Sequence, residues 1–226
     1  MALIIIFIYI NIIIQIKRRF IKNLTDDMKS NLFILLNKLD KILRENRIRY
    51  FIIGGTLLGS VRDGKFIPWD DDADIGILNE DLDKFNKIDF DKYGLKNESV
   101  CSDGIGKIML KGKYNSFNKM EGVFVDVFTF EKINNKYMYT FDGAKKWWPN
   151  EYFYDDELFP LREYDFENMK LYGPKECYKF CERAWGKNWK DTRYRSIIYY
   201  CKNNFYILSI LSIIVMIILI VNIIIR

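Results

Sequence analysis

The sequence predicts an α+β domain, in which a small β-sheet is flanked by helices, between two apolar terminal segments. Three observations predict this class. Residues 25–48 carry apolar side chains at helical spacing. Residues 50–53, 75–77 and 122–130 are apolar runs of strand length, separated by turn residues and polar stretches. The 226 residues are 50% hydrophobic, which is enough for one ordinary core once the ends are set aside.

The composition narrows the possible chemistry. The chain has no histidine, which excludes histidine-based triads, histidine-ligated zinc and histidine general bases. Its 4 cysteines lack the two correctly spaced pairs of a zinc site. The net charge of +5 is mild and the two signs are interspersed, so the sequence does not indicate a nucleic-acid partner. A phosphate-bearing donor or an anionic membrane surface would fit this charge equally well.

The first predicted element is an amphipathic helix over 25–48, with Thr25 as its N-cap and a leucine stripe facing the core. A buried strand over 50–53 follows, and Gly54-Gly55 ends it. Glycines let backbone N–H groups approach a bound group because no Cβ intervenes. A short helix over 56–62 would add an N-terminus, which is a natural anion site. We therefore expect donor-phosphate contacts from Gly54, Gly55, Thr56 and Arg62, with an exposed ion pair as the alternative for Arg62.

An acidic cluster comes next, and it leads into the second apolar run. Its members are Asp70, Asp71, Asp72 and Asp74. If 72–77 is a strand, Asp72 and Asp74 point to the same face, because side chains alternate along a strand. Two adjacent carboxylates stay ionised together when a cation lies between them, and oxygen ligands of this kind suit Mg2+ or Mn2+. The alternative is a solvated acidic turn, with Asp70 and Asp71 exposed or capping.

The second half of the domain contains one prominent strand. Residues 94–104 are polar and contain glycine, so we expect them to be exposed, and residues 107–111 could form a strand. Residues 122–130 predict the clearest strand, and Asp126 interrupts its run of Val and Phe. An isolated buried carboxylate is unfavourable, so Asp126 requires a polar partner or a metal. Capping of a backbone turn is the alternative.

The acidic segment resembles the signature of the LicD family, which includes fukutin and fukutin-related protein. The matching residues are Gly54-Gly55-Thr56-Leu57-Leu58-Gly59, Arg62 and Pro68-Trp69-Asp70-Asp71-Asp72-Ala73-Asp74. The resemblance continues through Phe159-Pro160-Leu161 and a helix opened by Pro174 and closed by Gly186. Trp185 stands where the family usually has Tyr. The resemblance to the LicD family covers about residues 30–190.

The resemblance implies a nucleotidyltransferase-like fold with a small mixed sheet. It also implies transfer of a phosphorylated alcohol, phosphocholine or ribitol phosphate, from a CDP-activated donor to a glycan. Asp126 matches the family's apolar-Asp-apolar-Phe motif. The resemblance thus makes Asp126 the third metal ligand beside Asp72 and Asp74, or the base that deprotonates the acceptor hydroxyl.

The two ends of the chain predict membrane attachment around a catalytic domain over 25–192. We expect residues 1–19 to form an uncleaved hydrophobic anchor or an interfacial segment, because their apolar run is short for a span. Residues 205–225 have the length and apolarity of one transmembrane helix. Basic residues on the domain side of both segments favour a cytoplasmic domain, whereas the eukaryotic relatives face a lumen, so the side stays open.

Two other functions remain possible. The first is a nucleotidyltransferase that releases diphosphate, because fold alone does not fix function. The second is a non-catalytic, membrane-anchored binding or scaffold protein.

Overall fold

The computed structural model describes residues 24–68, 70–99, 105–112 and 123–191. The predicted terminal segments, 1–19 and 205–225, lie outside these residues. Within the described part, no helix combines the length and apolarity needed to cross a membrane. The chain divides into two compact units, Met1–Gly186 and Lys187–Arg226, and every element named below belongs to the first.

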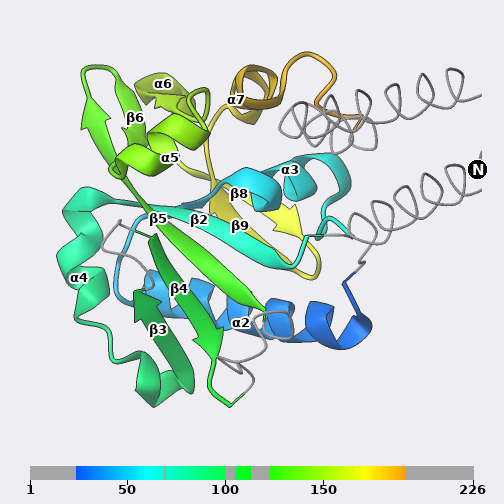
Figure 1. The fold of residues 1–226 in the computed structure, drawn as a ribbon, viewed down its shortest axis with the longest axis vertical. Helices are drawn as coiled ribbons and strands as arrows, with labels where there is room; N and C mark the ends of the chain where they lie inside the picture. The colour runs from blue at the N-terminus through cyan, green and yellow to red at the C-terminus, as the bar shows by residue number, and fades with distance from the viewer. Residues whose placement is uncertain (1–23, 69, 100–104, 113–122, 192–226) are drawn as a thin grey trace, which may run out of the picture. The chain divides into compact units, whose positions relative to one another are not determined.

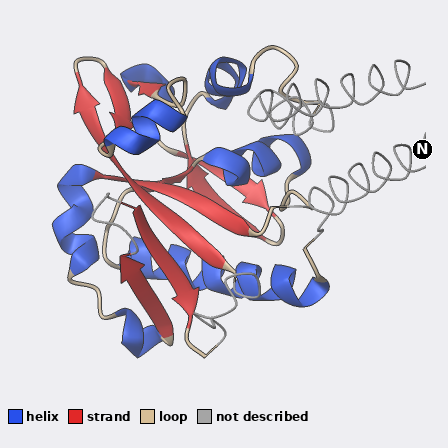
Figure 2. Ribbon diagram, viewed as in Figure 1, coloured by secondary structure: helices blue, strands red, loops and turns tan. Residues whose placement is uncertain are grey.

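Helices are interspersed among the strands of the first unit (Figures 1 and 2). The helices are α2 (Asp26–Glu45), α3 (Gly54–Asp63), α4 (Leu82–Asn86), α5 (Asp142–Trp147), α6 (Asp155–Leu158) and α7 (Cys177–Trp185). The strands are β1 (Tyr50–Ile52), β2 (Asp72–Leu78), β3 (Leu95–Ser99), β4 (Ile105–Leu110), β5 (Phe124–Ile133), β6 (Lys136–Tyr139), β7 (Phe153–Tyr154), β8 (Arg162–Phe166) and β9 (Met169–Gly173). Short 3-10 turns span Asn79–Asp81 and Phe90–Tyr93.

The main sheet is mixed. Its strands run in the order β1-β2-β5-β4-β3, with β6 added to β5 and β7 added to β6. Only the β2–β5 pair is parallel among the strand pairs described. Strands β8 and β9 form a separate hairpin. The predicted α+β class, with a small mixed sheet flanked by helices, is confirmed.

Helix α2 forms because its cap and its apolar stripe agree. The Thr25 side chain accepts a hydrogen bond from the backbone N–H of Met28, 3.2 Å away, as an N-cap should. The helix lies across β2, β4 and β5. The side chains that it buries there are Leu32, Leu35, Leu36, Leu39, Ile42 and Leu43. It ends at Glu45, earlier than predicted, because Arg47 adopts a φ of 52° and turns the chain toward β1.

Side-chain alternation gives the central strands two different faces. The face toward α2 buries small apolar side chains, namely Ala73, Ile75, Ile77, Val125 and Val127. The opposite face carries Asp72, Asp74 and Asp126 at one end. Farther along, aromatic rings cover the same face, and Gly76 makes room for them, because a Cβ there would lie 2.6 Å from the Phe51 ring.

Two further predicted boundaries are wrong, and one strand was not predicted. Helix α3 begins at Gly54 rather than at residue 56, so the glycine pair forms its first turn. Helix α7 begins at Cys177, after Pro174 rather than at it. Residues 95–99, which were expected only to be exposed, form edge strand β3, which pairs antiparallel with β4. The pairing overrides a polar local sequence, and Leu95 is the fully buried residue that fixes the strand to the core.

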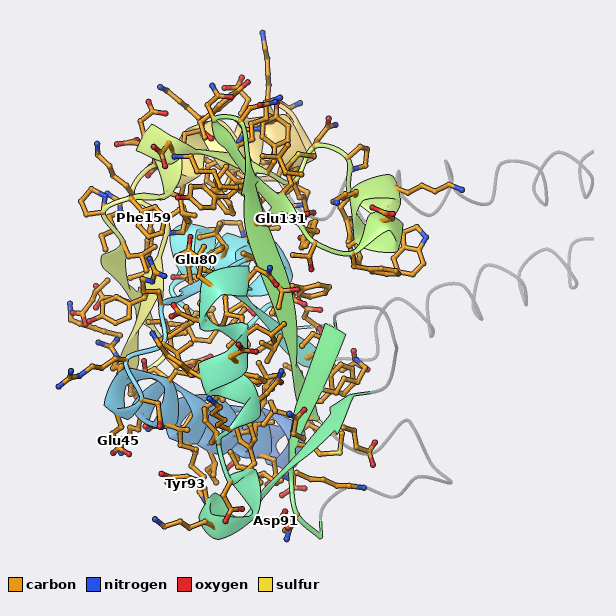
Figure 3. All side chains as sticks on the ribbon, turned by 90° about the vertical axis from the view of Figure 1, so that its left-hand side faces the viewer. Glu45, Glu80, Asp91, Tyr93, Glu131 and Phe159 are labelled. Carbon is orange, nitrogen blue, oxygen red and sulfur yellow. The ribbon has the colours of Figure 1, made fainter. Side chains whose placement is uncertain are left out.

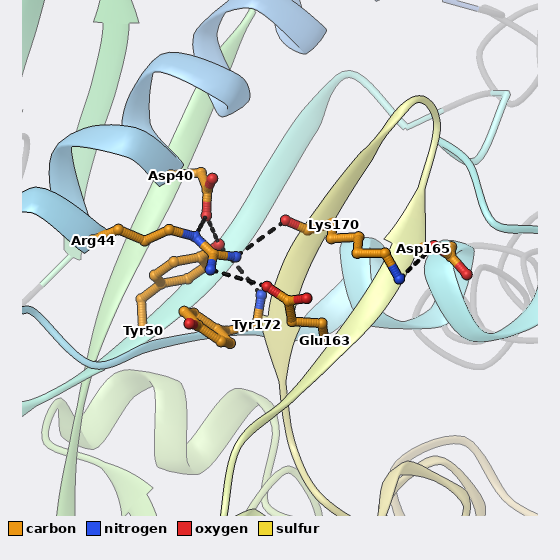
Figure 4. A network of polar contacts seen from close by, with 7 residues as sticks. All are labelled: Asp40, Arg44, Tyr50, Glu163, Asp165, Lys170 and Tyr172. Atoms are coloured by element: carbon orange, nitrogen blue, oxygen red, sulfur yellow. Dashed lines mark hydrogen bonds and ion pairs between the residues drawn. The ribbon is translucent and has the colours of Figure 1, made fainter.

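A polar network joins α2 to the β8–β9 hairpin (Figure 4). Arg44 donates to Asp40 (2.6 Å), to Glu163 (3.0 Å) and to the Lys170 carbonyl (3.2 Å). Its guanidinium lies 3.8 Å from the centre of the Tyr172 ring. Since β8 in turn accepts a hydrogen bond from Ser60 of α3 (3.1 Å), this network also supports the helix that follows β1. Other charged side chains project outward, as Glu45, Glu80 and Asp91 do in Figure 3.

Candidate active site

Three carboxylates meet where β2 and β5 run side by side. In the parallel register Asp74 lies opposite Asp126, and Asp72 precedes Asp74 by two residues on the same face. One oxygen from each of Asp72, Asp74 and Asp126 lies within 4.8 Å of the others. The structure thus brings together the three residues that the sequence predicts as metal ligands.

The start of α3 holds Asp74 in place. The backbone N–H of Gly55 donates to Asp74 Oδ2 at 3.2 Å, and the Thr56 hydroxyl oxygen accepts from the Asp74 N–H at 2.8 Å. A Cβ on Gly54 would lie 2.6 Å from Asp74 Oδ2, and a Cβ on Gly55 would lie 2.0 Å from Asp70 Oδ2. In this structure the two glycines therefore admit carboxylates of the protein itself. Donor-phosphate binding by Gly54, Gly55 and Thr56 stays a prediction.

Arg62 lies near the end of α3 and pairs with its neighbour. Its Nε donates to Asp63 Oδ2 at 2.7 Å. The side chain is only 11% exposed, and Nη1 is buried with no hydrogen-bond partner among the described residues. The ion pair considered as an alternative is therefore present, and a phosphate contact from Arg62 stays a prediction.

Burial, together with like charges for the first three, raises the pKa values of Asp70, Asp72, Asp74 and Asp126. For Asp74 burial is the largest cause, followed by the charges of Asp72, Asp70 and Asp126, and its pKa lies well above the usual value. Burial and the charges of Asp126 and Asp71 raise the pKa of Asp72 to about 6. Asp70 joins the group, because burial and then Asp72 raise its pKa. The alternative was a solvated acidic turn. In the structure these carboxylates instead lie in a partly buried site, where they repel one another.

One cation reaches the cluster from the neighbouring strand. Lys107 of β4 lies opposite Asp126 in the antiparallel register, and its Nζ lies 2.5 Å from Asp126 Oδ1. Burial raises the pKa of Asp126, whereas this lysine opposes the rise. Lys107 also lowers the pKa of Asp72, so its charge acts on two of the three carboxylates.

A further acid lies close to Asp74. The Tyr139 hydroxyl donates to Glu151 Oε2 at 2.8 Å, and burial raises the pKa of Glu151 to about 7. The charge of Glu151 is one of the causes that raise the pKa of Asp74. The Tyr139 ring packs between Phe128 and Phe130 of β5, with centroids 5.3 and 4.5 Å away. The aromatic face thus positions this carboxyl beside the acidic cluster.

The donor set fits a divalent cation that prefers oxygen. Three carboxylates from adjacent strands converge, and the raised pKa of each shows that its ionised form is disfavoured without a counter-charge. Hard cations such as Mg2+ bind through carboxylate oxygens and supply that charge. Asp72, Asp74 and Asp126 are the residues that would hold such an ion.

Sequence reasoning missed Lys107 and the Tyr139–Glu151 pair. The only signal for Lys107 was its position in a possible strand, and its contact with Asp126 depends on the β4–β5 register. Glu151 lies in a loop, and its environment is formed by β5 and β6. Neither contact follows from local spacing, because both are set by strand pairing across the sheet.

Comparison with known proteins agrees with this geometry. Residues 47–176 match the family described as "LicD/FKTN/FKRP, nucleotidyltransferase domain". An uncharacterised protein of Rickettsia prowazekii (strain Madrid E) is 34% identical over 148 residues, which cover 65% of this chain and 50% of that protein.

Two relatives have names that state an activity. The lipopolysaccharide cholinephosphotransferase LicD of Haemophilus influenzae (strain ATCC 51907 / DSM 11121 / KW20 / Rd) is 33% identical over 122 residues, which cover 48% of this chain and 46% of that protein. The ribitol-5-phosphate transferase FKTN of Homo sapiens is 28% identical over 156 residues, with coverages of 69% and 32%.

The chain spans about half the length of the first curated relatives that it matches. The family match covers more than half of this chain and includes α3, all three carboxylates and the sheet that joins them. The chain therefore belongs to the LicD family.

Proposed function

We propose that this chain transfers a phosphorylated alcohol, of the phosphocholine or ribitol-phosphate type, from a CDP-activated donor to a glycan acceptor. The observation that supports the proposal most is the convergence of Asp72, Asp74 and Asp126 within a LicD-family domain. The names of the LicD and FKTN relatives, a cholinephosphotransferase and a ribitol-5-phosphate transferase, support the general class of reaction.

The proposed reaction is a substitution at phosphorus. The acceptor hydroxyl oxygen forms a bond to the phosphorus that carries the alcohol, the bond from that phosphorus to the oxygen of CMP breaks, and the hydroxyl proton is released. Asp72, Asp74 and Asp126 would hold Mg2+ or Mn2+. When bound, such an ion neutralises charge on the donor phosphates and orients them.

The residues around the carboxylates provide positioning. The Gly55 N–H and the Thr56 hydroxyl fix Asp74 at the start of β2, and Lys107 fixes Asp126. The N-terminal turn of α3 lies at the same place and offers a location for the donor phosphates. Arg62 would add a charged contact.

Attachment to a membrane is part of the proposal. The apolar segments 1–19 and 205–225 support it, and they would hold the domain near a glycan or glycolipid acceptor. Retention of the full chain in the membrane pellet after alkaline carbonate extraction would support attachment, and its release would contradict it.

The experiment is product analysis with the purified full chain, Mg2+ or Mn2+, and a glycan acceptor. We expect CMP to be released from CDP-choline or CDP-ribitol. Asp74→Asn should lower this release by about a hundredfold or more, since a ligand to the catalytic ion is lost. Release of diphosphate from a nucleoside triphosphate would instead indicate nucleotidyl transfer, and a folded chain that binds neither metal nor nucleotide would indicate a scaffold.

A further inference from the structure

Lys107 is the cation that the structure places among the carboxylates, and nothing in the signature motifs points to it. It comes from β4, and the antiparallel register sets it opposite Asp126. Its Nζ lies 2.5 Å from Asp126 Oδ1. The same Nζ lies 3.5 Å from the centre of the Phe124 ring, two residues before Asp126 on β5. A carboxylate and an aromatic face thus hold the ammonium group from two sides.

The ammonium group has more to donate than these two contacts use. A lysine carries three N–H donors, and the hydrogen bond to Asp126 is the one described for Lys107. Its side chain is 25% exposed, so the group is reachable from solvent. A ligand at the acidic cluster could therefore accept a hydrogen bond from Lys107 without any movement of the sheet.

The charge of the site explains why a donor would need this contact. Burial raises the pKa values of Asp70, Asp72, Asp74 and Asp126, and neighbouring carboxylates add to the rise for the first three. Among the described residues, the Lys107 charge opposes this rise for both Asp72 and Asp126. A diphosphate brings further negative charge to the same place. One divalent ion leaves the cluster negative overall, so a second positive group next to the phosphates would reduce the remaining repulsion.

We propose that Lys107 has two successive partners: it holds Asp126 in the metal-free protein, and it contacts a phosphate oxygen of the nucleoside-diphosphate donor once Asp126 turns to the metal. This inference rests on the proposed function. Lys107 is then a positioning residue toward the metal site and a binding residue toward the donor. Removing the lysine charge should therefore strengthen metal binding and weaken donor binding, so binding measurements can test the proposal without turnover.

The test is calorimetric titration of Mn2+ alone, and then of CDP in the presence of saturating Mn2+, into the purified full chain and into Lys107→Met. Methionine keeps the length of the side chain and its contact with Phe124 but removes the charge. Mn2+ should bind the variant about tenfold more tightly, because the competing charge beside Asp126 is gone. CDP should bind it about tenfold or more weakly, because a charged hydrogen bond to phosphate is lost.

Three further variants control the experiment. Lys107→Arg keeps a charged donor and should retain most of the CDP affinity. Lys107→Gln is a second neutral variant, to be used if methionine prevents folding, as judged by circular dichroism. Lys111→Met removes the same charge from the residue just after β4, where the lysine pairs with exposed Asp91 at 2.9 Å, and it should change neither affinity.

The outcomes separate this inference from the proposed function. A folded Lys107→Met chain that binds Mn2+ and CDP as the wild type does would overturn the inference alone. Weaker binding of both would also overturn it, because it would show a purely structural role. A wild-type chain that binds no Mn2+ would overturn the metal site of the proposed function and this inference with it.

Discussion

Replacing Asp72 with Asn should make the metal-free protein more stable and the metal-bound protein less so. Asp72 is partly buried, and its pKa rises from the usual 3.8 to about 6 because of burial and of the charges of Asp126 and Asp71. At about 1.4 kcal/mol for each pKa unit, this rise corresponds to about 3 kcal/mol. Asparagine has nearly the same shape but no charge, so it removes that penalty wherever Asp72 would be ionised.

The sign follows from proton binding. The folded state holds the Asp72 proton more tightly than the unfolded state, so the stability of the wild type falls as the pH rises from about 4 to about 6 and stays low above that. At pH 8 with a chelator, Asp72→Asn should therefore raise the free energy of unfolding by up to about 3 kcal/mol. At pH 4 the two proteins should differ little.

Bound metal should reverse the order of stability of the wild type and Asp72→Asn. Mn2+ at a hundred times its dissociation constant should stabilise the wild type by about 2.7 kcal/mol, because it binds only the folded state. The variant should lose most of this gain. Urea unfolding of both proteins at pH 4 and pH 8, with chelator and with Mn2+, measures the free energy of unfolding under each of these four conditions. Asp83→Asn, on exposed α4, should stay within about 0.5 kcal/mol of the wild type throughout. A metal-free Asp72→Asn protein that is less stable than the wild type at pH 8 would refute the reasoning.

Three further changes probe the supports of the site. Gly54→Ala should weaken Mn2+ binding about tenfold or more in calorimetry, because its Cβ would lie 2.6 Å from Asp74 Oδ2. Gly64 has a similar positive φ with open space around it, so the control Gly64→Ala should leave the Mn2+ affinity unchanged. Arg44→Ala should lower the free energy of unfolding by about 2 to 3 kcal/mol in urea without changing Mn2+ affinity, since Arg44 bonds to Asp40, Glu163 and the Lys170 carbonyl rather than to the predicted metal ligands; an altered affinity would contradict this. Glu151→Gln should remove a loss of stability of about 3 kcal/mol that develops between pH 4.5 and pH 7, because burial raises the pKa of Glu151 to about 7; an unchanged pH profile would contradict this.

The sequence predicted the elements whose signals are local. Helix α2 follows from Thr25 and its leucine stripe, and β5 follows from a run of Val and Phe. The acids on β2 were correctly placed on one face, because strand alternation alone decides it. Strand β3 was missed because its residues are mostly polar and its pairing with β4 supplies the structure.

The supports of the site were harder to predict than the acids. The expectation that Gly54 and Gly55 face a donor phosphate stays a prediction, whereas their close approach to Asp74 and Asp70 was not predicted. That relation depends on where β2 returns beside α3, some twenty residues later in the chain, and no local pattern encodes it. Lys107 was missed for the same reason, because only the β4–β5 register sets it opposite Asp126.

The register between β2 and β5 explains both the chemistry and the weakness of the site. A shift of one residue would turn Asp126 to the α2 face and bury a carboxylate among leucines, so the apolar side chains of the strands hold it opposite Asp74. The same register brings like charges close together, and their repulsion destabilises the fold when no cation is bound. The contacts of Asp74 with α3 and the Lys107–Asp126 pair oppose that repulsion from two sides. Stability supplied by the sheet and its helices thus maintains a preorganised, unfavourable cluster, as expected where a protein departs from the rules of stable packing at a functional site.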